Sequence, residues 1–236
     1  MPKFGVLKPV GALFTAFLLA LAGMTGICQE PATGVKEIVD QVLNARTRSN
    51  ELAPDYSWTS RTEVMKKDEV LNILIEKMEY GPDGGLVKKT LNEQGARMPT
   101  AFLIRDIAEA EKENIEKFLY GLHDFLLKYS LKDGDRLTRF IESSGWKIGD
   151  DKKEIIFTGN NVVEQGDKLT WWVDLANYSS SKIEVSTVFE GDSITFTATF
   201  NTLKEGLNYI AYAQALIPRK ELTLQVQYYD FTPYKF

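Results

Sequence analysis

The fold class is decided by residues 182–200, which read KIEVSTVFEGDSITFTATF. Apolar and polar residues alternate on both sides of Glu190-Gly191-Asp192, so each flank predicts a strand with one apolar face. Parallel strands need a crossover of about a dozen residues or more, and this connection is far shorter. The stretch therefore predicts an antiparallel hairpin.

The same pattern continues on both sides of this hairpin. Further strands are expected at Glu154–Thr158, Lys168–Leu175, Tyr209–Ala215 and Glu221–Asp230. Short polar turns separate them, and short turns join antiparallel neighbours. The second half of the chain therefore predicts one meandering antiparallel sheet.

Three more strands are expected near the N-terminus. They cover Tyr56–Val64, Val70–Tyr80 and Leu86–Leu91, and the dense turn signal Gly81-Pro82-Asp83-Gly84-Gly85 separates the last two. In the first strand Tyr56, Trp58 and Val64 share one parity, which marks its buried face.

Helical spacing occurs in three segments. Val35–Leu43 begins an amphipathic helix that ends near Asn50, Ile107–Tyr129 carries a long apolar stripe, and Asp135–Ser143 is a shorter helix. A sheet of about nine strands curls strongly, and its apolar face needs a cover. The predicted fold class is α+β: a strongly curved antiparallel β-sheet, a half-barrel of about nine strands, covered by helices on its concave face.

Residues 1–28 resemble an export signal, and residues 29–236 are expected to form a single domain. Lys3 and Lys8 precede the thirteen uncharged residues Val10–Ala22. That run is shorter than the ~20 residues needed to cross a bilayer. The expected location is the periplasm or the cell envelope.

Cys28 is the only cysteine, so no disulfide can form within the chain. Two interpretations of Cys28 remain open. In one it is lipidated and anchors the protein to a membrane. In the other it is a small residue near the cleavage site, and Ile27 before it departs from the usual lipid-attachment pattern.

The charge of the chain argues against two classes of partner. The sequence holds 28 basic and 33 acidic residues, a formal net charge of −5. Nucleic acids and anionic membrane faces attract basic surfaces. Neither is expected as an electrostatic partner.

The usual catalytic and metal-binding patterns are missing from the sequence. His123 is the only histidine, and no serine lies in a G-x-S-x-G context. Zinc sites draw on several Cys and His ligands, and phosphate-binding glycine motifs are also absent. We predict no catalytic residue, no cofactor and no metal. A hydrolase that uses two carboxylates remains a third-ranked alternative.

Apolar and aromatic side chains are the remaining candidates for a site. They either fill the core or line a cavity that the helices do not fill. Trp171 and Trp172 are adjacent in a strand and must face opposite sides of the sheet. The residues expected to bind a hydrophobic ligand are Tyr56, Trp58, Leu122, Leu126, Trp171 and Phe196.

The order of these elements resembles the lipoprotein-carrier superfamily of the bacterial envelope. The likeness rests on the Tyr56-x-Trp58 strand, the hairpin around Tyr80–Gly84, the helical insert and the long meander. It implies a non-enzymatic cavity protein whose partner is a lipid or a lipidated protein. The carrier's latch arginine is not assigned, because Arg61 has the parity opposite to Trp58. The alternative is an envelope structural or sensing module that acts through protein contacts without lipid.

Overall fold

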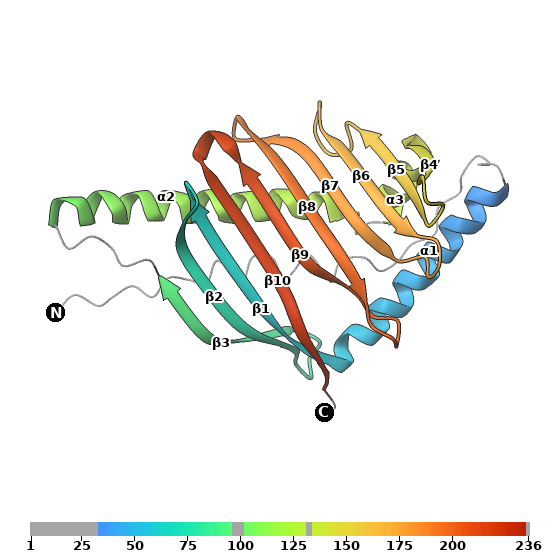
Figure 1. The fold of residues 1–236 in the computed structure, drawn as a ribbon, viewed down its shortest axis with the longest axis horizontal. Coiled ribbons are helices and arrows are strands. Elements are labelled where there is room, and N and C mark those ends of the chain that lie inside the picture. Colours follow the sequence, from blue (N-terminus) through green and yellow to red (C-terminus); the bar gives the residue numbers. More distant parts are fainter. Residues whose placement is uncertain (1–32, 96–101, 131–133, 235–236) are drawn as a thin grey trace.

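The computed structural model describes residues 33–95, 102–130 and 134–234. These residues form one antiparallel sheet of ten strands with three α-helices, in the strand order β3-β2-β1-β10-β9-β8-β7-β6-β5-β4. The sheet curves without closing, and the helices lie on one side of it (Figure 1). The predicted fold class is confirmed. The expected export signal and Cys28 lie outside the described residues.

The strands have the following bounds: β1 Tyr56–Lys66, β2 Glu69–Tyr80, β3 Leu86–Gly95, β4 Gly145–Ile148, β5 Glu154–Asn160, β6 Lys168–Asp174, β7 Ser180–Phe189, β8 Asp192–Thr202, β9 Asn208–Ile217 and β10 Leu222–Pro233. The helices are α1 Thr33–Leu52, α2 Phe102–Leu126 and α3 Gly134–Ser143. A short 3-10 turn, η4 Leu127–Ser130, follows α2.

Strand β1 joins the two halves of the sheet. It pairs with β2 through Thr62↔Leu74 and with the far end of the chain, β10, through Thr62↔Val226. Apart from β1 and β10, strands that are neighbours in the sheet are consecutive in the chain. The N-terminal strands therefore extend the C-terminal meander, and β3 and β4 are the two edge strands of the whole sheet.

The β7–β8 hairpin has the turn that its sequence predicts. Glu190 and Gly191 have φ angles of 50° and 79°. Two successive residues with positive φ match the twist of the flanking strands. Phe189, at the end of β7, then packs against the rings of Phe118 and Phe125 from α2, with centroids 5.4 and 5.1 Å apart.

The core lies between the concave face and α2. Inward-facing side chains of successive strands are fully buried, and the stripe of α2 covers them with Phe118, Leu119, Leu122, Phe125 and Leu126. Helix α3 packs on β5, where Phe140 lies close against Gly159. Both helices are thus held by apolar contacts.

Two details differ from the sequence prediction. The sheet has ten strands because the short β4, whose four residues are all exposed, pairs with β5. The central helix ends at Leu126, and the expected last residues form η4 instead. Within the described residues, none of the helices has the length and apolar character needed to cross a membrane.

Candidate ligand site under helix α1

Helix α1 is the least firmly packed of the long elements. Val42 is its only fully buried apolar side chain among residues 36–52, and Ile38 is half-buried. Leu43, expected on the apolar stripe, is 38% exposed. Figure 1 shows α1 crossing the sheet near one end, whereas α2 extends beyond the strands at the opposite end. The seam between α1 and the sheet is therefore weakly filled.

One cavity lies beneath the middle of α1. It has a volume of about 50 Å³. Val42, Arg46 and Asn50 form its helix side, and Leu169, Trp171 and Ile183 form its sheet side. Arg46, Ser49 and Asn50 are the polar groups of the helix side, and the sheet side adds the polar Ser180 and Asn208 to its apolar side chains.

A smaller cavity lies beneath the C-terminal end of α1. It has a volume of about 20 Å³, and its aromatic wall consists of Trp58, Tyr80 and Phe231. The Trp58 ring stacks on Phe231 at a centroid distance of 5.7 Å. Ser49, Asn50 and Asn208 line both cavities. The two spaces therefore follow one another along the same helix.

These cavities are small for a lipid. An apolar cavity of about 150 Å³ admits a single benzene molecule. The cavity of about 50 Å³ under α1 is large enough for a small polar group but too small for an acyl chain. Room for a chain along this seam requires that α1 moves away from the sheet.

A polar contact fastens α1 at this point. The Ser49 hydroxyl donates to the carbonyl oxygen of Asn208 at 3.1 Å and accepts from the Asn208 amide at 2.9 Å. The Asn208 side chain also donates to the carbonyl oxygen of Ser180 at 3.0 Å. The start of β9 is thereby tied to α1 and to β7.

Arg46 enters the same cavity from α1. Its Nη2 donates to the carbonyl oxygen of Ser130 at 3.3 Å, while its buried Nε has no hydrogen-bond partner. Burial lowers the pKa of Arg46 to about 9. Within the described part of the chain, no carboxylate forms an ion pair with Arg46.

Tyr129 supports the floor of this cavity from η4. Its hydroxyl donates to Asp167 Oδ2 at 2.8 Å and lies 2.8 Å from the Thr187 hydroxyl. Burial, followed by the contact with Asp167, raises the pKa of Tyr129 well above its usual range. Asp167 also accepts backbone N–H groups from Val162, Val163 and Glu164. The β5–β6 loop and η4 therefore share one buried carboxylate.

The six sequence-predicted ligand residues divide into two groups. Trp171 lines the larger cavity and Trp58 lines the smaller one. The other four are packed in the core and line none of the cavities described above: Tyr56, Leu122, Leu126 and Phe196. Their role in binding stays a prediction.

The concave face of β1 carries an unexpected polar stripe. Trp58 Nε1, Ser60 Oγ and Thr62 Oγ1 are buried, and none of the three has a hydrogen-bond partner among the described residues. Thr62 lies between the apolar Leu74 and Val226 on the neighbouring strands. This interior therefore contains buried hydroxyl groups that form no hydrogen bond within the described part of the chain.

A third space opens at the other rim of the sheet. It is a groove of about 300 Å³ between α2 and the β9–β10 connection. Lys220 lies over the Phe118 ring at 4.6 Å and pairs with Asp192 at 3.3 Å, so it covers the main aromatic side chain of the groove. The groove offers less apolar surface than the seam under α1.

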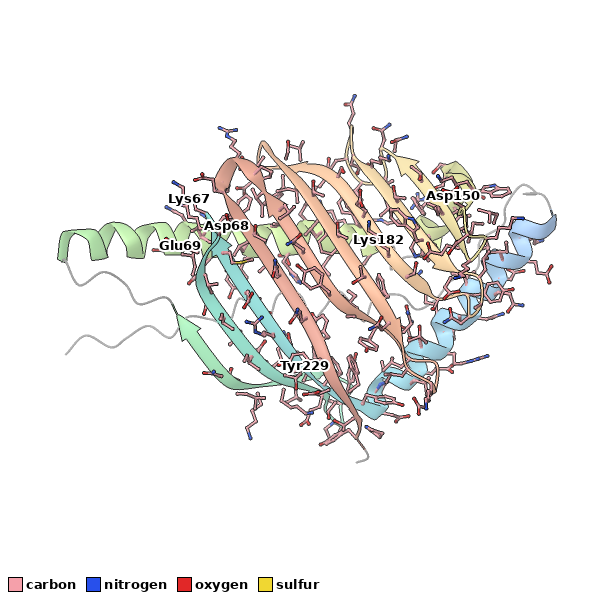
Figure 2. The ribbon with its side chains drawn as sticks, viewed as in Figure 1. Lys67, Asp68, Glu69, Asp150, Lys182 and Tyr229 are labelled. Atoms are coloured by element: carbon pink, nitrogen blue, oxygen red, sulfur yellow. The ribbon has the colours of Figure 1, made fainter. Side chains whose placement is uncertain are left out.

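Several residues discussed from sequence lie away from these cavities. Arg61 pairs with Glu63 on the opposite face of β1, and Trp172 lies on the opposite face of β6 with Lys182 Nζ 4.7 Å from its ring. Figure 2 labels Lys182 on the outer face of the sheet. His123 is buried on α2, with Nδ1 3.1 Å from Asp124 Oδ1. Among the described residues, no group of three or more His, Cys, Asp or Glu side chains is placed to hold a metal ion.

The sequence reasoning missed Arg46, Ser49, Asn50 and Asn208. A signal for three of them was present in the helix pattern. Arg46, Ser49 and Asn50 follow the buried Val42 by four, seven and eight residues, so all three share its face of α1. Polar residues on a buried face indicate a polar contact or a site.

Comparisons with known proteins give structural likenesses alone. No protein-family model matches the chain, and no curated protein matches it. A DUF1329 family protein from Desulfovibrio piger is similar at 10% identity and a TM-score of 0.38, over 84% of this chain and 92% of that one. A LolA superfamily protein from Nitrosomonas europaea is similar at 9% identity and a TM-score of 0.36, over 83% and 94%.

A third similar structure is a domain from Vibrio parahaemolyticus that is described as an outer membrane lipoprotein-sorting protein. It shares 11% identity at a TM-score of 0.42, over 84% of this chain and 92% of that one.

Proposed function

We propose that this chain is an exported, non-enzymatic protein that binds or carries a hydrophobic ligand, a lipid or a lipidated protein, between its curved sheet and its helices. The ligand enters the seam under α1, and α1 acts as the movable cover. Residues 1–28 serve as the signal peptide and residues 29–236 as the single binding domain.

The observation that carries this proposal is the pair of cavities along α1. They share Ser49, Asn50 and Asn208, and a tryptophan lines each of them. The two tryptophans come from β1 and β6, which lie on different halves of the sheet. A chain-shaped ligand that follows α1 contacts both of them.

The energetics favour α1 as the moving element. A fully buried large apolar side chain contributes about 1.5–3 kcal/mol. Helix α2 buries five such side chains over the sheet, whereas α1 buries Val42. Each methylene of an acyl chain contributes about 0.8 kcal/mol on burial, so a ten-carbon stretch offsets the loss of the α1 contacts.

A direct experiment is lipid extraction from the native protein. The full chain is produced in a bacterial host, purified without detergent, and analysed by mass spectrometry for bound lipid. The proposal predicts extractable lipid, together with saturable binding of a fluorescent fatty-acid analogue by the stripped protein. Protein that carries no lipid and binds no analogue contradicts the proposal.

A second candidate function is a structural or sensing module that acts through protein contacts. The observation in its favour is the edge strand β4, where Trp146 is 49% and Ile148 39% exposed. Exposed edge strands are templates for pairing with another chain. This function predicts that the same extraction finds no lipid. It also predicts that Ile148→Pro, which removes an edge N–H, disrupts partner binding.

A further inference from the structure

Among the residues that the structure describes, Arg46 has no counter-ion. Its guanidinium carries five N–H donors, of which one makes the hydrogen bond to Ser130. Its Nε is buried and unpartnered, and no described carboxylate lies within ion-pair distance.

A second unused donor lies one helical turn further along α1. The Asn50 side-chain nitrogen, Nδ2, is buried without a hydrogen-bond partner and lines the same cavity as Arg46. The Ser180 hydroxyl, also in the lining, accepts from Trp171 Nε1 at 3.0 Å. That bond leaves the hydroxyl hydrogen of Ser180 able to donate. The polar side of the cavity is therefore rich in donors.

Burying these donors costs free energy while they have no acceptor, and a bound anion offsets that cost. A buried charge without a partner is strongly unfavourable, and so is a buried donor without an acceptor. A carboxylate or phosphate oxygen satisfies both, and Arg binds these groups in a paired geometry. An anion that pairs with Arg46 therefore offsets free energy that is lost when Arg46 is buried without one.

The surroundings indicate what the anion is attached to. Leu169, Trp171, Ile183 and Phe200 belong to the apolar part of the lining, and an inorganic ion gains nothing from these side chains. The volume of about 50 Å³ suits a headgroup oxygen cluster and excludes the tail. The second, aromatic cavity continues along α1 from the shared residues Ser49 and Asn50.

We infer that Arg46 and Asn50 bind the carboxylate or phosphate of an anionic amphiphile, whose apolar chain runs along α1 from Trp171 toward Trp58. This inference rests on the proposed function and deepens it. It specifies the charge of the ligand, the end of the seam that holds its headgroup and the residues that recognise it.

The test compares a charged and a neutral ligand. Palmitate and methyl palmitate share the same chain, and they are titrated against the native protein, Arg46→Gln and Arg48→Gln. Arg48 is an exposed arginine on the same helix, so Arg48→Gln removes an equal charge away from the cavity. The thermal midpoint of each variant checks its folding.

The inference predicts that Arg46→Gln weakens palmitate binding by about tenfold or more. Methyl palmitate binding stays within about twofold of the native value, and Arg48→Gln leaves both unchanged. An equal loss for both ligands, or no loss for palmitate, overturns the inference and leaves the proposed function standing.

Inorganic phosphate distinguishes the source of the anion. If phosphate displaces bound palmitate only weakly, the result supports the headgroup of an amphiphile as the anion. Phosphate binding as tight as that of palmitate, and abolished by Arg46→Gln, overturns the amphiphile and with it the proposed function. Failure of the native protein to bind palmitate, its methyl ester and phosphate overturns both.

Discussion

Ser49 and Asn208 are joined by two hydrogen bonds, at 3.1 and 2.9 Å, that fasten α1 to the start of β9. They lie between the two cavities, where both residues belong to the lining of each. If α1 is the cover of the ligand site, this contact is its fastening.

A disulfide at this contact is expected to block ligand uptake. The variant carries Ser49→Cys and Asn208→Cys on a Cys28→Ser background, which removes the only native cysteine. In the oxidised protein, uptake of a fluorescent fatty acid slows strongly, and reduction restores it. Ser49→Cys alone is the control and shows no redox dependence. Uptake at an unchanged rate in the oxidised double variant contradicts a moving α1.

Two buried threonines are expected to respond in opposite ways to the same substitution. Thr62→Val removes a hydroxyl that has no partner and raises the free energy of unfolding by about 1 kcal/mol. Thr187→Val removes a hydroxyl that lies 2.8 Å from the Tyr129 hydroxyl and lowers it by about 1–2 kcal/mol. Urea unfolding of both variants checks the pair. A destabilised Thr62→Val protein shows that this hydroxyl has a partner in solution.

Asp167 is expected to stabilise the η4 and β5–β6 loop region that forms the floor of the larger cavity. It accepts three backbone N–H groups and the Tyr129 hydroxyl, and these bonds involve a charged acceptor. Asp167→Asn converts one acceptor oxygen into a donor and is expected to lower the free energy of unfolding by more than about 2 kcal/mol. Asp151→Asn, at an exposed loop position, is the control and leaves stability nearly unchanged. Equal stability of the two variants in urea unfolding contradicts this assignment.

Much of the fold follows from local pattern. Period-two alternation and short turns are properties of neighbouring residues, so β7 and β8 and their turn at Glu190-Gly191 were predictable from sequence. The pairing of β1 with β10 was not, because it joins residues at opposite ends of the chain. Strand β4 was missed because its four residues are all exposed and show no alternation in burial.

The site was predictable only in part. Aromatic residues at buried parities marked Trp58 and Trp171, which line the two cavities. The same rule also selected Phe196, which is fully buried in the core, because parity gives the face of a strand and not the packing above it. Arg46 was missed because its significance depends on having no counter-ion among the described residues, which is visible only in three dimensions.

The central claim is that a hydrophobic ligand lies on the concave face, under α1. Trp171 and Trp172 test it directly, because they are neighbours on opposite faces of β6. In variants that keep one of these tryptophans and replace the other three with Phe, brominated palmitate is titrated and fluorescence quenching is measured. The account predicts saturable quenching of Trp171 and none of Trp172. Equal quenching of both, or quenching of Trp172 alone, contradicts it.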